Sequence, residues 1–316
     1  MQKKRGRRDA ASPRRITNAD FLRMRVLLTG ASGFLGRYVL DQLTQQGTAT
    51  SVVGRARPAG YAGDFISADL LRVDDYSAIV QSAKATHLLH LAWYAEHGQY
   101  WTSPLNLRWV EASIRLVEAF CAAGGKKVVV AGTCAEYDWS YGYCREDVTP
   151  LTPGSLYGTA KDATRRLLAA ICNRHQIPFA WGRIFLPYGQ GEDQRRLIPS
   201  LIKVFQGKQP PFGVNATAYR DFLHAEDVAR GFVQLLLSEA EGSYNISSGQ
   251  PIQVADVVRL IASAYRGDPD TVLALSTARP GEPEMLVGEN QKLKALVWQA
   301  LHPIADIAGA VAVKKS

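Results

Sequence analysis

A tyrosine and a lysine four residues apart carry the clearest chemical signal in this chain. Tyr157 and Lys161 open a stretch whose apolar spacing predicts a helix over residues 156–175. On a helix these two side chains are neighbours on one face. A free phenol, with a pKa near ~10, is a poor acid or base at neutral pH, but an adjacent ammonium stabilises the phenolate. The pair therefore predicts general acid–base catalysis by Tyr157. Thr133, which follows the preceding predicted strand (residues 127–131), is a further candidate for this site.

A glycine-rich turn joins the first predicted strand, residues 25–29, to a predicted helix over residues 34–46. Its three glycines would permit a tight turn, close approach of the backbone to a pyrophosphate, and close packing of helix on strand. The start of a helix also favours an anion, because its amide groups are free and its dipole is positive there. This setting predicts a dinucleotide site. The residues expected to contact the dinucleotide are Gly30, Ser32, Gly33, Phe34, Leu35, Gly36 and Arg37.

The end of the second predicted strand, residues 50–53, bears on the choice of dinucleotide. An acid there would bind the ribose 2′-OH of NAD, whereas an arginine suits the 2′-phosphate of NADP. The sequence has no acid at this point and instead has Arg55, with Arg57 behind it, while Arg37 could face the same phosphate. We therefore predict NADP(H) in preference to NAD(H). The alternative is that these arginines are ordinary surface charge.

Strands alternate with helices through the first 185 residues, which predicts a parallel sheet covered on both faces. We expect an α/β fold, a doubly wound parallel sheet of the Rossmann type with a smaller mixed α/β C-terminal substrate-binding portion. The divisions expected are a basic tail (1–23), a dinucleotide-binding domain (24–185) to which later segments return, and a mainly substrate-binding portion (186–316). The remaining strands are expected at 64–67, 86–92, 179–184 and 243–247, and the remaining helices at 74–83, 104–123, 195–206, 225–237, 254–264 and 290–300.

Composition excludes several classes of protein. The chain has 316 residues, of which 47% are hydrophobic and 21% charged, as is usual for a globular protein. No apolar run approaches the ~18 residues that a membrane-spanning helix needs. The formal net charge is +8, but residues 1–25 hold nine Lys or Arg against two Asp, so the rest of the chain is nearly neutral. We therefore expect no nucleic-acid partner and a dispensable tail, with Met24 as a candidate start.

The four cysteines are Cys121, Cys134, Cys144 and Cys172, and none forms a Cys-x-x-Cys pair or a Cys/His cluster with zinc spacing. We predict no metal site. The tail also lacks the apolar stretch of a secretory signal. These features favour reduced thiols in a cytoplasmic protein.

Together with further motifs, the glycine turn and the Tyr/Lys pair resemble the extended short-chain dehydrogenase/reductase family of nucleotide-sugar epimerases, dehydratases and ketoreductases. The resemblance extends from residue 24 to about residue 303. The matching stretches are the turn at 29–36, Asp69 with Leu70, His90-Leu91-Ala92, Thr133, Tyr157 with Lys161, and the segments 183–189, 220–229 and 245–249.

The resemblance implies a role for each of these residues. Thr133, Tyr157 and Lys161 would be catalytic, Tyr157 as general acid, Thr133 as hydrogen-bond donor to the carbonyl oxygen, and Lys161 as the group that tunes Tyr157 and holds the nicotinamide ribose. Additional cofactor contacts would come from Asp69, Leu70, Leu91 and Ala92. Substrate contacts would come from Trp93, Cys134, Tyr188 and Arg220.

Alternatives remain for the substrate residues. Trp93 could equally be packing, Cys134 could be a small filler, and Arg220 could form a structural ion pair with Asp221 or Glu226. An arginine fork nevertheless suits a diphosphate.

Two departures from the family pattern limit the reactions that we expect of this chain. The 4,6-dehydratases carry an Asp-Glu pair after the catalytic Thr, where this chain has Cys134 and Ala135, with Glu136 one place further on. Many members also carry an Asn where this chain has Leu186. We therefore predict an NADPH-dependent reductase of a 4-keto group on a nucleotide-linked deoxysugar. The alternatives are an NAD-dependent nucleotide-sugar 4-epimerase and a non-catalytic NADP-sensing regulator.

A homodimer is also implied, because the family commonly pairs the helices predicted here at 104–123 and 156–175. Apolar residues on these helices exceed what one sheet face needs. Those residues are Ile114, Leu116, Val117, Phe120, Leu167, Leu168 and Ile171.

Overall fold

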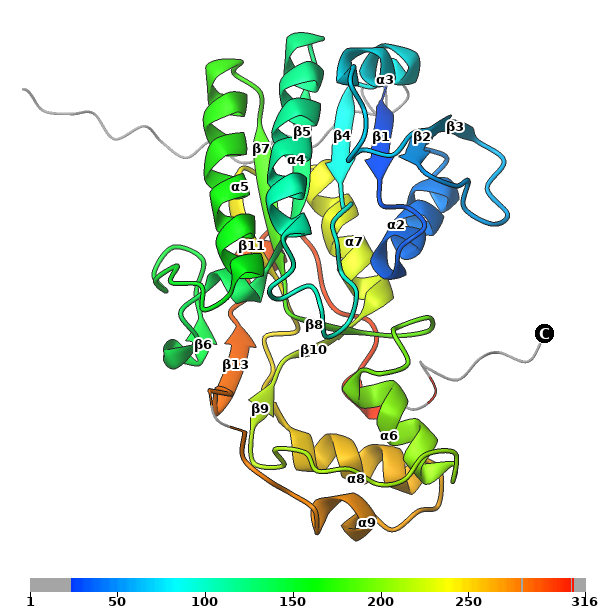
Figure 1. Cartoon of the computed structure of the whole chain (residues 1–316), viewed down its shortest axis with the longest axis vertical. Helices are drawn as coiled ribbons and strands as arrows, with labels where there is room; N and C mark the ends of the chain where they lie inside the picture. The colour runs from blue at the N-terminus through cyan, green and yellow to red at the C-terminus, as the bar shows by residue number, and fades with distance from the viewer. Residues whose placement is uncertain (1–23, 280, 308, 310–316) are drawn as a thin grey trace, which may run out of the picture.

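The computed structural model describes residues 24–279, 281–307 and 309, so the predictions about the basic tail lie outside the described residues. A seven-stranded parallel sheet forms the centre, in the order β11-β7-β5-β4-β1-β2-β3 (Figure 1). Its strands are β1 (Arg25–Thr29), β2 (Ala49–Gly54), β3 (Asp64–Ser67), β4 (His87–His90), β5 (Lys127–Thr133), β7 (Phe179–Ile184) and β11 (Gly242–Ile246). The strands β1 and β5 carry continuous apolar runs, and β7 is buried along nearly its whole length, as expected for strands covered on both faces.

Helices cover both faces of this sheet (Figure 1). On one face, α2 (Phe34–Gln45) and α7 (Ala225–Leu236) pack against each other and against residues of β1 and β7. On the other face lie α3 (Tyr76–Ala83), α4 (Leu105–Ala122) and α5 (Leu156–Arg174). The predicted doubly wound α/β fold is therefore confirmed.

A smaller mixed portion follows the carboxyl ends of β5 and β7. Its four-stranded sheet has the order β12-β9-β13-β6, with one antiparallel pairing, and β8 pairs with β10 in parallel. It has a separate apolar core between α6 and α8. The strands are β6 (Tyr143–Cys144), β8 (Leu186–Tyr188), β9 (Tyr219–Arg220), β10 (Phe222–His224), β12 (Ile252–Gln253) and β13 (Met285–Gly288), and the helices are α6 (Leu197–Phe205), α8 (Val254–Ala264), α9 (Asp270–Leu273) and α10 (Gln291–Lys294). Short 3₁₀ turns occur at Cys134–Glu136, Trp139–Tyr141 and Ile304–Asp306.

The helix predicted over residues 290–300 was wrong in extent, because α10 ends at Lys294. Val297 adopts a left-handed conformation (φ 64°), which an α-helix cannot continue through. The chain turns there so that Trp298 becomes buried, and its indole N–H donates to the Asp227 carbonyl on α7 (3.2 Å). Tertiary packing of one tryptophan thus replaces the second half of the predicted helix.

The expectation that seven apolar residues of α4 and α5 exceed the needs of the sheet face was also wrong for most of them. Leu116, Val117, Phe120 and Leu168 are fully buried in the core between these helices and the sheet. Leu167 is 46% exposed. The apolar surplus available for a partner is therefore smaller than the sequence pattern suggested.

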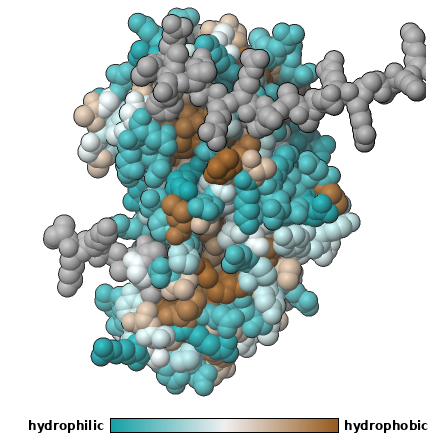
Figure 2. Space-filling view, turned by 180° about the vertical axis from the view of Figure 1, so that it is seen from behind, coloured by the Kyte–Doolittle hydropathy of each residue, from teal (hydrophilic) through white to brown (hydrophobic). Residues whose placement is uncertain are grey.

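The face of the molecule seen in Figure 2 is mainly hydrophilic. On the face seen in Figure 2, the hydrophobic residues form separate patches. No helix in the described part of the chain is long and apolar enough to cross a membrane.

A buried carboxylate ties two strands together where β5 ends. Glu136, fully buried in the 3₁₀ turn after β5, accepts from the Thr133 backbone N–H (2.8 Å), the Trp181 indole (2.9 Å) and the Arg183 guanidinium (2.7 Å). Thr133 also caps the turn, accepting from the Ala135 N–H (3.2 Å). Because the ion pair between Glu136 and Arg183 is excluded from water, removing either charge would leave the other uncompensated.

We expect Glu136→Gln to lower the free energy of unfolding by about 3–5 kcal/mol, because it leaves the buried Arg183 charge without its partner. Asp256→Asn is the matched control, since the Asp256–Arg259 pair is exposed and such pairs contribute at most about 1 kcal/mol. Urea denaturation measures both variants. Equal small losses would show that the buried pair does not stabilise the fold in this way.

Candidate active site

The strand order reverses direction along the sequence between β1 and β4, which is the point where open α/β sheets bind their ligands. The glycine turn after β1 is built for close contact. Gly30 has a positive φ of 76°, and a Cβ there would come within 2.7 Å of the Ala92 nitrogen. A Cβ on Gly36 would lie 1.9 Å from the Gly30 oxygen, so α2 and β1 could not pack as closely. The predicted reasons for these two glycines hold in the structure.

The start of α2 is suited to an anion. The helix begins at Phe34, and Gly33 at its N-cap provides no side-chain hydrogen bond to the first turn. Ser32, Phe34 and Leu35 lie at this helix start, within the predicted dinucleotide contacts. The turn therefore fits a pyrophosphate, whose oxygens would accept from backbone N–H groups.

A buried relay of hydrogen bonds, which the sequence did not reveal, fixes the chain after β4. The Ser113 hydroxyl donates to a backbone carbonyl one turn earlier, so it accepts from His90 Nε2 (2.9 Å). His90 Nδ1 then accepts from the Thr29 hydroxyl (2.7 Å), whose oxygen accepts from the Leu91 and Ala92 N–H groups (3.2 and 3.1 Å). Burial lowers the pKa of His90 to about 3, so the ring is neutral. The relay holds Leu91 and Ala92 against the glycine turn, where cofactor contacts were predicted.

The three arginines considered for the 2′-phosphate, Arg37, Arg55 and Arg57, differ in their contacts. Arg57 donates to the Tyr61 and Gly63 carbonyls (3.3 and 2.7 Å), and Arg37 donates to the Gln190 carbonyl (2.8 Å). Arg55 is exposed directly after β2. Arg55 is therefore the best placed of the three to reach a group at the end of this strand.

Two further predicted cofactor contacts, Asp69 and Leu70, lie just after β3. Asp69 accepts from the Leu71 N–H (3.1 Å) and Leu70 is buried.

Thr133, Tyr157 and Lys161 meet at the carboxyl end of β5. Tyr157 lies in the first turn of α5, whose N-cap Ser155 accepts from the Gly158 N–H (3.1 Å). Burial raises the pKa of Tyr157 above its ordinary value, and a hydrogen bond with Thr133 acts in the opposite direction. Burial also lowers the pKa of Lys161 to about 7, while the nearby Glu136 carboxylate raises it. The ammonium donates to the Ala131 carbonyl (2.8 Å). The three predicted catalytic residues are thus brought together.

Glu136, one place beyond the positions of the dehydratase Asp-Glu pair, is occupied by structural contacts. Both oxygens of Glu136 accept the structural hydrogen bonds described above. Cys134 is buried, and burial raises the pKa of its thiol. No residue of the 134–136 turn is therefore arranged to protonate a leaving hydroxyl.

Aromatic rings pack on one side of Tyr157, and sequence analysis missed them. We call Tyr100, Trp101 and Trp139 the aromatic wall. Tyr100 and Trp101 pack edge-on against the Tyr157 ring, with centroids 4.9 and 5.8 Å away, and Trp139 packs edge-on against Trp101 at 6.0 Å. The Trp101 carbonyl also accepts from the Tyr157 N–H (3.1 Å). The signal available was the density of Trp and Tyr after the fourth strand. The wall makes this side of the site apolar.

A cavity of about 170 Å³ lies in the smaller portion, between α6 and β9. Arg220, a predicted substrate contact, lines it and forms an ion pair with Glu282 (2.7 Å), so the alternative of a structural ion pair was wrong in its partner, given as Asp221 or Glu226. Arg196, Arg279 and Glu192 also line the cavity and were not foreseen. In the sequence, the only feature that could have pointed to this cavity was the set of arginines at 195, 196 and 279.

Tyr188, the remaining predicted substrate contact, belongs to the core of the smaller portion. It is 1% exposed and packs against the His224 ring, with centroids 5.4 Å apart. Its hydroxyl has no hydrogen-bond partner among the described residues.

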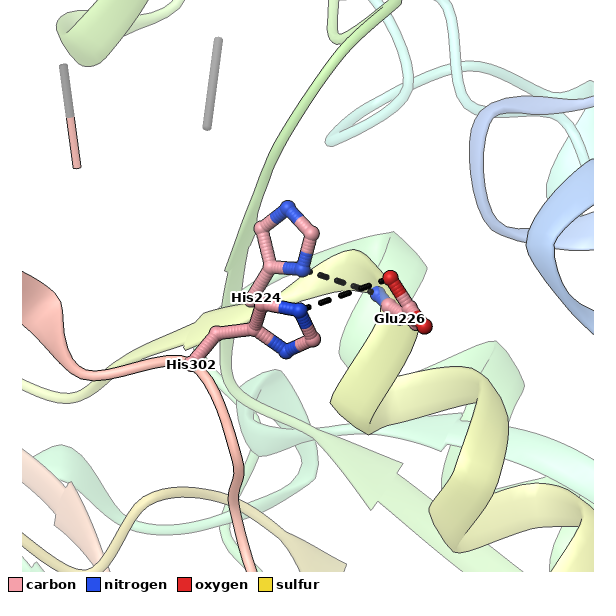
Figure 3. Close-up of side chains that lie close together, drawn as sticks. All are labelled: His224, Glu226 and His302. Atoms are coloured by element: carbon pink, nitrogen blue, oxygen red, sulfur yellow. Dashed lines mark hydrogen bonds and ion pairs between the residues drawn. The ribbon is translucent and has the colours of Figure 1, made fainter. Parts of the chain in front are cut away.

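Three potential metal ligands, His224, Glu226 and His302, lie close together at the start of α7 (Figure 3). Their hydrogen bonds fasten the C-terminal segment to this helix. His224 Nδ1 caps α7 by accepting from the Glu226 N–H (3.4 Å), and His302 Nδ1 contacts the Asp227 carboxylate (3.1 Å). These contacts give the cluster a structural role, and the absence of a metal stays a prediction.

Comparison with known proteins agrees with this geometry. The model of the NAD dependent epimerase/dehydratase family matches residues 26–247. A dTDP-6-deoxy-L-talose 4-dehydrogenase (NAD(+)) of Aggregatibacter actinomycetemcomitans is 27% identical over 72% of this chain and 86% of its own length. A UDP-glucose 4-epimerase of Azospirillum brasilense is 25% identical over 89% of each chain.

Among solved structures, MoeE5 in complex with UDP-glucuronic acid and NAD superposes with a TM-score of 0.79 at 28% identity, covering 91% of this chain and 97% of that one. The UDP-glucose 4-epimerase of Thermus thermophilus superposes with a TM-score of 0.75 at 24% identity, covering 91% and 97%. The fold, the glycine turn and the family match all agree, and the chain belongs to the NAD dependent epimerase/dehydratase family, an enzyme family of extended short-chain dehydrogenases/reductases.

Proposed function

We propose that this enzyme reduces the 4-keto group of a nucleotide-linked deoxysugar, using NADPH. The observation that carries the proposal is the placement of Tyr157, which hydrogen-bonds Thr133 at the carboxyl end of β5 and has Lys161 one turn further along α5. Like any phenol, Tyr157 holds its proton at neutral pH; burial raises its pKa, opposite to the shift expected from Lys161, and the hydrogen bond with Thr133 works against that rise. A reduced nicotinamide, when bound, supplies the hydride to the carbonyl carbon. Proton donation to the oxygen completes the reduction to an alcohol.

The neighbours of Tyr157 assist this proton transfer. Thr133 hydrogen-bonds Tyr157 and would donate to the developing alkoxide. Lys161 would hold the nicotinamide ribose and help restore the Tyr157 proton. The glycine turn and the free N–H groups of α2 would hold the pyrophosphate, which their geometry fits.

Two features support the substrate class. The cavity carries Arg220, Arg196 and Arg279, and guanidinium groups suit the oxygens of a diphosphate. The aromatic wall beside Tyr157 would favour a sugar whose nearby carbon lacks a hydroxyl, because an unpaired hydroxyl against aromatic rings is costly. The Aggregatibacter relative is named for a 6-deoxy sugar carried on dTDP, which is the same class.

A 4-epimerase is the second candidate, because one tyrosine can accept the proton of the 4-hydroxyl and return it to the same oxygen, while a bound nicotinamide would take and return the hydride at C4. The Azospirillum relative is named a UDP-glucose 4-epimerase, and MoeE5 was solved with NAD. The strand end without an acid argues against it. A non-catalytic NADP-sensing regulator is the third candidate, and the assembled Thr133, Tyr157 and Lys161 argue against that.

We also propose cytoplasmic location and a homodimer through α4 and α5, resting on Leu107 and Leu167, which are 58% and 46% exposed. The thiols of all four cysteines are free.

Tyr157→Phe should lower kcat by about 10²–10⁴-fold, because the proton donor is lost, while NADPH affinity stays within about twofold. Tyr141→Phe, at an exposed position, is the control and should keep the wild-type rate. Single-turnover oxidation of NADPH with a 4-keto sugar nucleotide measures the rate, and fluorescence titration measures affinity. A wild-type rate in Tyr157→Phe would contradict the mechanism.

Arg55→Asp should weaken NADPH binding about tenfold or more relative to NADH, because it replaces a charge-assisted contact to the 2′-phosphate with repulsion. Arg57→Ala should leave the ratio unchanged, since Arg57 is bonded to loop carbonyls. Titrating both dinucleotides against each variant gives the ratios. Equal loss of both, or tighter NADH binding by the wild type, would overturn the NADP assignment.

Light scattering of the purified chain should give twice the 34.6 kDa chain mass at micromolar concentration. Leu167→Glu should shift the protein toward the monomer, because it places a charge in the proposed interface that α4 and α5 of one chain form with α4 and α5 of the other. A wild type that scatters as a single chain would refute the dimer.

A further inference from the structure

The ammonium of Lys161 has no direct ion pair among the described residues. The residue is 3% exposed, and its one hydrogen bond goes to the Ala131 carbonyl. The Glu136 carboxylate in the 3₁₀ turn raises the pKa of Lys161, but it accepts its hydrogen bonds from three other donors. A buried cation without a carboxylate in contact needs some other group that favours its charge.

That group is the Trp93 ring. Lys161 Nζ lies 4.0 Å from the Trp93 ring centroid, well within the ~6 Å range in which a ring face attracts a cation. Trp181 also faces the ammonium but is farther away, at 5.9 Å. The other titratable groups around it are His90 on β4, which is neutral, and Tyr157 and Asp162 on α5 itself, of which Asp162 is paired with two arginines.

The Trp93 ring is held rigidly in this position. Its indole N–H donates to Asn106 Oδ1 (2.8 Å), and the Asn106 amide donates to the Tyr100 and Ser103 carbonyls (2.7 and 2.9 Å). Asn106 is completely buried at the start of α4. The ring also stacks on Trp109, with centroids 6.2 Å apart and an interplanar angle of 27°. Rotating Trp93 would break a buried, fully satisfied amide network.

We propose that Trp93 is a positioning residue that holds the Lys161 ammonium in place through its ring face, with Asn106 fixing the ring. The sequence left Trp93 open between substrate contact and packing, and its contacts assign it instead to the catalytic lysine. This inference rests on the proposed role of Lys161 in binding the cofactor.

The consequence is a pH dependence with a defined sign. The ammonium is present below the pKa of Lys161 and is lost as the pH rises through it, so cofactor binding should weaken on the alkaline side. Without the ring the cation loses a stabilising partner. Trp93→Leu should therefore lower by about one unit the pH at which NADPH binding weakens, which we call the alkaline limb, in line with the loss of a desolvated cation–π contact. Trp93→Phe keeps a ring face and should recover most of the shift.

The experiment is a fluorescence titration of NADPH across pH 6–9 with the wild type, Trp93→Leu, Trp93→Phe and Lys161→Met, and with the double variant of Trp93→Leu and Lys161→Met. Melting temperatures confirm that each variant is folded. If Trp93 acts through Lys161, Trp93→Leu should weaken binding about tenfold near neutral pH in the wild-type background and cause little further loss in the Lys161→Met background. A Trp93→Leu protein with the wild-type alkaline limb, or equal losses in both backgrounds, would overturn the proposal.

No sugar substrate enters this measurement. If the proposed reduction is wrong, turnover fails while the titration still reports the coupling between Trp93 and Lys161.

Discussion

The buried charge of Glu136 is the constraint on which the rest of the site depends. A carboxylate without access to water must be neutralised and hydrogen-bonded, and Arg183 from the neighbouring strand does both. Arg183 also donates to the Tyr137 hydroxyl (3.0 Å), which donates to Asn245 Oδ1 on β11 (2.7 Å). The Asn245 amide then donates to carbonyls of Cys144 and Glu289, in and next to the smaller sheet. One network therefore links the large sheet, at the turn that follows Thr133, to the smaller portion.

This arrangement has a chemical consequence. Since Glu136 serves the fold, the turn after Thr133 offers no free carboxylate, which leaves Tyr157 as the proton donor in the proposed reduction. The same charge raises the pKa of Lys161 against the effect of burial. The charge on Lys161 thus depends in part on a residue outside the proposed substrate contacts.

Local patterns were enough to predict the sheet, the glycine turn and the meeting of Thr133, Tyr157 and Lys161. Each depends on spacing within one strand, turn or helix, or on the rule that parallel strands end at a common edge. The remaining features depend on contacts between distant residues. Arg220 finds Glu282 some 62 positions away, the strands of the smaller portion are only two to four residues long, and Trp298 ends a helix by packing on α7. No periodicity in the sequence reports such pairings.

The central claim is net reduction at one carbon, and isotope transfer tests it most directly. In separate reactions the enzyme is given a 4-keto-6-deoxy sugar nucleotide and a 4-hydroxy sugar nucleotide, each with NADPH carrying deuterium on the transferable position, and the products are examined by NMR and mass spectrometry. The account predicts one deuterium at C4 of the sugar for each NADPH oxidised. Interconversion of 4-hydroxy epimers without net NADPH oxidation, and with no deuterium in the product, would contradict it and establish the epimerase.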